Sequence, residues 1–137
     1  MSEDCIFCKI VQKQAPASVV YEDDVILAFM DIRPVSEGHT LVIPKHHYRD
    51  IFDTPPSLLA ATHKIAQKIA SPVKKVTNAD GISIVQQNGV AAGQDIFHIH
   101  VHIIPRFQGR KTPHFRDLTV VDREILDKVA ERIKQQF

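Results

Sequence analysis

Three histidines, His98, His100 and His102, alternate with apolar residues near the C-terminal end of the chain. A period of two is typical of a β-strand, which would direct the three imidazoles to one face and the intervening side chains to the other. An imidazole needs partners for both nitrogens when it is buried, but near neutral pH it serves as nucleophile, acid, base or metal ligand. The pattern favours catalysis, with metal ligation and a row of partly exposed histidines as the alternatives.

A second group able to do chemistry is the cysteine pair Cys5 and Cys8 near the N-terminus. A Cys-x-x-Cys spacing supplies half of a tetrahedral zinc site, and in a reducing compartment such a pair more often binds metal or does redox work than forms a structural disulfide. The spacing alone also allows two buried free thiols. A redox role is the weakest interpretation because the βαβ pattern that usually accompanies it is absent.

The composition limits the classes of function. The chain has 137 residues and a net charge of +1. The length favours one domain over residues 1–137, with a core at 4–107 and a C-terminal extension carrying a helix at 108–137. The balanced charge provides no basic footprint for nucleic acid. Without a long apolar run or a signal peptide, we expect a cytoplasmic protein that does not contact membranes.

Five strands and three helices must position these residues. The periodicity predicts strands at 19–22, 25–30, 39–43, 82–87 and 97–105, with Pro44 stopping the third. It predicts a short helix over 5–12 capped by Asp4, a long helix whose apolar stripe runs from Leu58 to Ala70 and which kinks or stops early at Pro72, and a final helix capped by Asp122. A flexible glycine-containing loop is expected at 88–94. This arrangement is an α+β fold with an antiparallel sheet.

The histidine strand resembles the His-φ-His-φ-His-φ-φ motif of the histidine triad (HIT) family, where φ is apolar. Other segments resemble the family in the same order over residues 4–107: Cys5-Ile6-Phe7-Cys8-Lys9-Ile10, Leu27-Ala28-Phe29-Met30-Asp31-Ile32, Gly38-His39-Thr40-Leu41-Val42-Ile43-Pro44-Lys45, and Asn88-Gly89 followed by Ala92-Gly93-Gln94. The chain is most similar to the Hint-like, prokaryotic zinc-bearing branch.

The resemblance implies a HIT-like half-barrel of five antiparallel strands that pairs as a homodimer. It also implies a nucleotide hydrolase or nucleotidyl transferase that cleaves at the α-phosphorus of purine nucleoside phosphoramidates or related conjugates and releases a nucleoside monophosphate. The alternatives are a dinucleoside polyphosphate hydrolase and a nucleotide-binding sensor or adaptor with vestigial catalysis. A metalloenzyme with an open metal site would instead lose activity with a chelator.

The resemblance also assigns roles within the histidine strand. His100 is the expected nucleophile, because a neutral imidazole nitrogen attacks without deprotonation if a backbone carbonyl holds the proton on its other nitrogen. His102, about 6.6 to 7 Å along a strand, would be too far to act on His100 directly but suited to a phosphate oxygen. His39, from the adjacent strand, would support the triad, and His98 is its first member.

Nine further residues stand at nucleotide-binding positions of the family, eight of them matching its pattern and Asp95 departing from it. Asp31 would accept hydrogen bonds from the ribose hydroxyls, although an aspartate at a strand end is also common in turns. Phe7, Ile10, Phe29 and Ile32 would form the apolar wall of the base pocket, which would discriminate weakly between bases. The alternative is that these side chains belong to the core, which is the preferred interpretation for Ile10. The glycines of the phosphate loop let backbone N–H groups approach an anion. The complete set is Phe7, Ile10, Phe29, Asp31, Ile32, Asn88, Gly93, Gln94 and Asp95.

By the same resemblance, a structural zinc ion is bound by Cys5, Cys8, His47 and His98, at about one ion per chain, and the chemical step needs no metal. The family spacing favours His47 over the adjacent His46. If His98 binds zinc, it cannot also handle phosphate, so its two expected roles compete.

Asp95 departs from the family pattern, in which a serine often stands at this position. An ionised carboxylate there would repel phosphate unless it turns away, faces a cationic leaving group or acts as a protonated acid. We therefore predict an amine leaving group or poor turnover of polyphosphates.

Overall fold

The computed structural model describes residues 4–111, 113 and 117–137. Its single sheet has the order β1-β2-β3-β5-β4, and every pair of neighbours is antiparallel. This confirms the expected α+β class and the five-stranded antiparallel sheet. The strands are β1 (Val19–Glu22), β2 (Ile26–Met30), β3 (Thr40–Pro44), β4 (Gly81–Val85) and β5 (Val101–Arg106).

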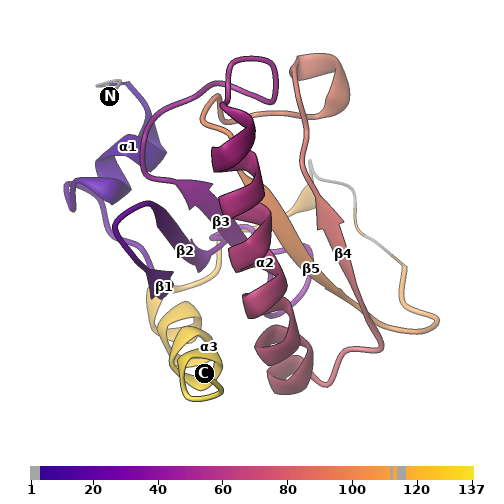
Figure 1. Ribbon diagram of the computed structural model, residues 1–137. Coiled ribbons are helices and arrows are strands. Elements are labelled where there is room, and N and C mark those ends of the chain that lie inside the picture. The colour runs from indigo at the N-terminus through magenta and orange to yellow at the C-terminus, as the bar shows by residue number, and fades with distance from the viewer. Residues whose placement is uncertain (1–3, 112, 114–116) are drawn as a thin grey trace.

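Two helices cover one face of the sheet. The long helix α2 (Pro56–Thr77) lies across the middle strands, and α3 (Arg123–Lys134) lies beside β1, as Figure 1 shows. The side chains between them form the larger core, because alternate residues of each strand point to the same face. Its sheet residues are Val20, Ile26, Ala28, Met30, Val42, Val101 and Ile103.

The opposite face carries the chemistry. Alternate residues there form a smaller apolar cluster, on which Phe7 of the short helix α1 (Ile6–Val11) packs. His39 precedes β3 and His102 lies within β5, in register with Leu41 of β3. Because Leu41 belongs to this smaller cluster, His102 shares its face.

The ends of two helices differ from expectation. Helix α1 is capped by the Cys5 side chain, whose Sγ accepts a hydrogen bond from the Cys8 N–H, so Asp4 is not the cap. Helix α2 does not stop at Pro72 but continues to Thr77, since Pro72 is buried with Val73 and their packing offsets the lost hydrogen bond. It ends at Asn78 in the left-handed conformation.

The expected histidine strand is shorter than its sequence pattern. β5 begins at Val101, so His98 and His100 precede the strand and only His102 lies within it. The backbone before Val101 has other partners: the Ile99 N–H donates to the carbonyl of Tyr48 at 2.8 Å.

The last helix and the 88–94 loop lie where they were expected, with small changes. Asp122 stands at the N-cap of α3, but its side chain makes no capping hydrogen bond. The 88–94 loop contains a short 3-10 helix, η1 (Val90–Ala92). Within the described part of the chain, no helix is both long and apolar enough to cross a membrane.

Candidate active site and metal-binding cluster

His100 is held in one tautomer by the backbone. Its Nδ1 lies 2.7 Å from the carbonyl oxygen of His98. A carbonyl only accepts, so Nδ1 carries the proton and, in the neutral ring, Nε2 keeps a free lone pair. Burial lowers the pKa of His100 and thereby favours this neutral form. The structure therefore provides the carbonyl that a nucleophilic imidazole requires.

His39 and His102 form a hydrogen-bonded pair with a defined direction. The Val35 N–H donates to His39 Nδ1 at 3.0 Å, which leaves the proton of neutral His39 on Nε2. His39 Nε2 lies 2.9 Å from His102 Nδ1, so it donates there, and neutral His102 carries its own proton on Nε2. Burial makes the largest contribution in both rings and lowers the pKa of His39 to about 3 and that of His102 to about 4.

The two histidines of the motif therefore present opposite groups. His100 Nε2 carries a lone pair, whereas His102 Nε2 carries a proton. Their ring centroids are 4.9 Å apart, which is closer than the rise along a strand predicted. Neither Nε2 has a hydrogen-bond partner among the described residues, yet no described side-chain nitrogen or oxygen is fully buried without one. Both atoms must therefore reach the surface, through the 5% and 8% of these residues that is exposed.

Asp31 follows β2 and stands beside this pair. Its Oδ2 lies 3.5 Å from His39 Nε2, and its Oδ1 accepts the Arg33 N–H at 2.9 Å. Since His39 is neutral at pH 7, this contact is not an ion pair. Burial raises the pKa of Asp31 to about 6, and the negative charge of Asp95 contributes in the same direction.

The residues expected to form the base pocket meet only in part. The Phe7 ring contacts Phe29 and His100 edge-on, with centroids 5.4 Å and 5.2 Å away. Ile32 is 44% exposed beyond Asp31 and is not in the buried cluster. A cavity of about 540 Å³ lies between α1 and the β1–β2 edge; of the expected pocket residues only Ile10 lines it, so this cavity is separate from the histidines.

The 88–94 loop is braced by Gln94. Its Oε1 accepts the Gly89 N–H at 2.8 Å, and its Nε2 donates to the Arg49 carbonyl at 2.7 Å. The buried Gln94 amide is therefore occupied with holding the loop rather than free for a ligand. Gly93 has φ +93°, and a Cβ there would lie 2.7 Å from Gln87 Nε2, so this turn requires glycine.

Asn88 is held by a hydrogen bond to the neighbouring segment, whereas Asp95 is exposed. Asn88 Oδ1 accepts the Ile51 N–H at 2.7 Å, which joins the loop to the segment after β3. Asp95 is exposed, and its negative charge raises the pKa of His100 and of His102 against the effect of burial. Asp95 is thus electrostatically coupled to the histidine centre.

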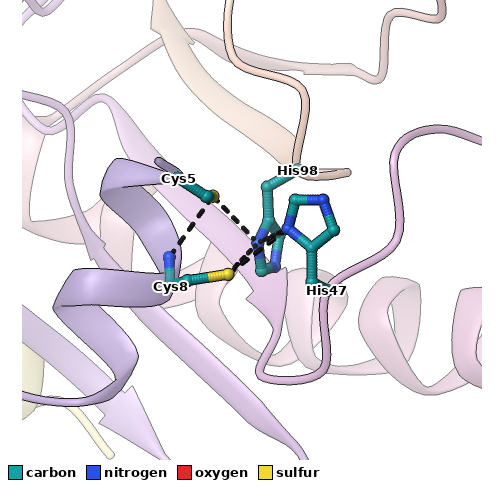
Figure 2. Close-up of side chains that lie close together, drawn as sticks. All are labelled: Cys5, Cys8, His47 and His98. Carbon is teal, nitrogen blue, oxygen red and sulfur yellow. Dashed lines mark hydrogen bonds between the residues drawn. The ribbon is translucent and has the colours of Figure 1, made fainter. Parts of the chain in front are cut away.

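The two cysteines and two histidines converge on one point, as Figure 2 shows. Cys8 Sγ lies 3.3 Å from His47 Nδ1 and 3.6 Å from His98 Nδ1. Cys5 Sγ lies 3.5 Å from His98 Nδ1, and the two Nδ1 atoms are 3.2 Å apart. His46 is exposed and outside the cluster, as the choice of His47 anticipated.

These distances fit a tetrahedral metal ion. With bonds of about 2.3 Å to sulfur and about 2.0 Å to nitrogen, zinc holds its ligand atoms about 3.3 to 3.8 Å apart. His98 Nε2 lies 2.7 Å from the Pro44 carbonyl and therefore carries the proton, which leaves the Nδ1 lone pair directed at the cluster. A ligating histidine is commonly oriented in this way by its second nitrogen.

A second group with metal-ligand atoms close together, Asp31, His39 and His102, has a different nature. The Val35 N–H occupies His39 Nδ1, so His39 Nε2 carries a proton and has no lone pair for an ion. His39 donates to His102, and Asp31 lies beside this hydrogen-bonded pair; we call these three side chains the His39 relay.

Several parts of this site have no signal in the sequence. The Val35 N–H and the carbonyls of His98, Pro44 and Tyr48 orient the rings, but backbone groups are present at every position. Only Pro44 stood out beforehand, as the expected end of a strand.

Comparison with known proteins places this geometry in a family. Residues 12–109 match the model of the HIT domain. The chain is 45% identical over 106 residues to an adenylylsulfatase, HINT3, of Arabidopsis thaliana, covering 77% of this chain and 54% of that protein. The chain thus spans about half the length of this relative.

Solved structures agree. A HIT-like protein from Bartonella henselae is 41% identical with a TM-score of 0.91, covering 100% of this chain and 99% of that one. A zinc-bound histidine triad family protein from Mycobacterium smegmatis is 40% identical with a TM-score of 0.85, covering 96% and 91%. The chain therefore belongs to the HIT family, a family of nucleotide-binding proteins that are typically nucleotide hydrolases or transferases.

Proposed function

We propose that the protein hydrolyses purine nucleoside phosphoramidates or related conjugates at the α-phosphorus and releases a nucleoside monophosphate. One observation carries this proposal: His100 and His102 stand side by side with opposite tautomers, and both Nε2 atoms reach the surface. A nucleophile next to an N–H that can hydrogen-bond a phosphate oxygen is what transfer of a nucleotidyl group requires.

The reaction has two balanced steps. His100 Nε2 bonds to the α-phosphorus, and the bond from phosphorus to the leaving nitrogen breaks with its electron pair on that nitrogen. The leaving amine takes up a proton from solvent, while the neutral His102 Nε2–H donates a hydrogen bond to a non-bridging oxygen of the α-phosphate. Water then attacks the nucleotidyl-histidine; its oxygen remains on the monophosphate, its proton passes to solvent, and His100 is released.

The nucleoside would lie between Asp31 and the apolar residues around Phe7. The half-buried Asp31 carboxylate accepts only one hydrogen bond, from the Arg33 N–H, among the described residues. It keeps acceptor capacity for two ribose hydroxyls. Apolar walls such as Phe7 and Phe29 offer little to distinguish one purine from another.

The cluster of Cys5, Cys8, His47 and His98 would hold a structural zinc ion. Four protein ligands leave no open position, so bound zinc supplies stability and no step of the reaction. His98 is then a metal ligand and not a phosphate ligand, because its Nδ1 points into the cluster and its Nε2 to Pro44.

We also propose a homodimer formed through the edge of the sheet. β4 is an edge strand, and its Ile84 is 44% exposed. A second copy pairing along β4 would satisfy the free strand edge and cover this side chain. Light scattering at several concentrations tests this, and a monomer at all of them would contradict it.

The decisive experiment is turnover of an adenosine 5′-phosphoramidate ester by the wild type and by His100→Ala. We expect AMP release by the wild type and a loss of about 10³-fold or more in the variant. The matched control is His63→Ala, which removes an exposed histidine of α2. Equal AMP release by the wild type and His100→Ala would refute the mechanism.

Two parallel substrates decide the leaving group. Adenosine 5′-phosphosulfate is included because a relative is named as an adenylylsulfatase, and diadenosine tetraphosphate because polyphosphates are the runner-up substrates. Turnover of either one above the phosphoramidate would replace the proposed substrate class while keeping the histidine chemistry. If the folded protein turns over none of the three substrates, a nucleotide sensor is favoured.

A further inference from the structure

His98 takes part in two different groups through different atoms. Its ring Nδ1 faces Cys5, Cys8 and His47 in the metal-binding cluster (Figure 2). Its backbone carbonyl accepts the His100 Nδ1–H at 2.7 Å, the contact that leaves His100 Nε2 free to attack. One residue therefore connects the metal ligands with the reactive ring.

The sheet does not hold this carbonyl in place. Pairing of β5 with β3 begins at Val101, opposite Val42, and His98 precedes the strand. The adjacent Ile99 N–H instead donates to the Tyr48 carbonyl at 2.8 Å, and Tyr48 directly follows His47. The position of the His98 carbonyl therefore depends on the His98 ring and on the segment carrying His47.

The cysteine end of the cluster reaches His100 as well. Phe7 lies between Cys5 and Cys8 in α1, and its ring meets that of His100 at 5.2 Å and 90°. Helix α1 has only six residues, too few to be stable by itself, so its cysteine contacts matter for its position. Two routes thus run from the cluster to His100: the His98 carbonyl and the Phe7 ring.

We propose that metal binding at this cluster positions the nucleophile, by fixing the His98 carbonyl and with it the Nδ1–H tautomer of His100. His98 is then a positioning residue, and metal loss lowers the rate of the chemical step more than it lowers nucleotide affinity. The proposal rests on the proposed function for the role of His100, but the tautomer it predicts is measurable without turnover.

The first test compares two adjacent histidines. His47→Ala removes a cluster ligand, and His46→Ala removes its exposed neighbour outside the cluster. For His47→Ala we expect zinc loss, a kcat lower by about 10- to 100-fold, and an AMP dissociation constant within about threefold of the wild type. His46→Ala should match the wild type in all three. An unchanged kcat in zinc-free His47→Ala would overturn the proposal.

The second test observes the tautomer directly. Long-range ¹H–¹⁵N spectra of the imidazoles should show His100 protonated at Nδ1 in the zinc-loaded protein and as a mixture of Nδ1–H and Nε2–H after chelation. Adding zinc back should restore the single form. A His100 ring that stays purely Nδ1–H without metal would overturn the proposal. Absence of turnover in zinc-loaded wild type would refute the proposed function, but these spectra would still decide the coupling.

A third variant separates positioning from general unfolding. Cys5→Ser removes a metal ligand but keeps an oxygen that can accept the Cys8 N–H, so the cap of α1 is preserved. We expect native circular dichroism, retained AMP binding and the same loss of kcat as in His47→Ala. If Cys5→Ser, His47→Ala and chelated wild type all lose the fold and AMP binding together, the effect is global and the proposal fails.

Discussion

The metal-binding cluster and the His39 relay are similar in composition and opposite in chemistry. Each brings three or four histidine, cysteine or aspartate side chains within a few ångströms. In the cluster, the backbone carbonyl of Pro44 takes the His98 proton and leaves a lone pair facing inward. In the relay, the backbone N–H of Val35 occupies the lone pair of His39 and leaves a proton facing inward. The backbone partner therefore decides whether a histidine presents a lone pair or an N–H to its neighbours.

The largest expected effect is the loss of zinc from the metal-binding cluster, which the relay should not share. Cys8→Ser should abolish zinc binding, while Asp31→Asn in the relay should retain about one zinc per chain, measured by atomic emission on protein purified without chelator. We also expect the melting temperature of Cys8→Ser to fall by about 10 °C or more, since about 1 kcal/mol corresponds to about 4 °C in a chain of this size. If the wild type and Asp31→Asn also contain no zinc, the metal assignment is refuted.

The next effect breaks the relay. His39→Leu removes both the acceptor for Val35 N–H and the donor to His102, so His102 loses the partner that sets its tautomer. We expect kcat on the phosphoramidate to fall by about 100-fold with zinc content unchanged. His39→Gln, whose amide both accepts and donates, should recover part of the rate. Equal rates for the Leu and Gln variants would show that the direction of the relay is irrelevant.

A smaller effect sharpens the relay through pH. Burial raises the Asp31 pKa to about 6, so folding disfavours its ionised form relative to the unfolded chain. Its contribution to stability is therefore present below the unfolded value of 3.8 and lost as the pH rises through about 6. Ribose hydroxyls bind the ionised form, so adenosine affinity should be level above about pH 7 and fall by up to tenfold per unit below pH 6.

Adenosine is the appropriate probe because it has no phosphate to titrate in this range. Calorimetry between pH 5 and pH 8 measures the profile. Asp31→Asn should bind more weakly and remove this pH dependence. A wild-type profile that is flat down to pH 5 would contradict ribose binding by Asp31.

The smallest expected effect concerns the negative charge of Asp95, which acts on His100 and His102. Asp95→Ser removes a negative charge that raises the pKa of His102 and of Asp31. We expect turnover of diadenosine tetraphosphate to rise about fivefold relative to the phosphoramidate, the equivalent of about 1 kcal/mol for one partly screened charge. An unchanged ratio of the two rates would remove Asp95 as a determinant of the leaving group.

Much of the fold was predictable because it depends on periodic patterns. The five strands and three helices follow from apolar residues recurring at two or at three and four positions. The errors occurred where a specific contact overrode the local pattern. Pro72 remains inside α2 because burial in the core compensates it, and the histidine strand begins late because Ile99 pairs with Tyr48 instead of β3.

By itself, the sequence determined the antiparallel α+β fold, the family and the set of histidines and cysteines proposed for the site. Residue types and spacings are local information and are legible along the chain. The tertiary structure alone decided which nitrogen of each histidine carries a proton, because that depends on Val35, Pro44 and the His98 carbonyl. The resemblance left His98 with two competing roles, and the tertiary structure separated them, because folding directs its Nδ1 to Cys5 at 3.5 Å and its Nε2 to the Pro44 carbonyl.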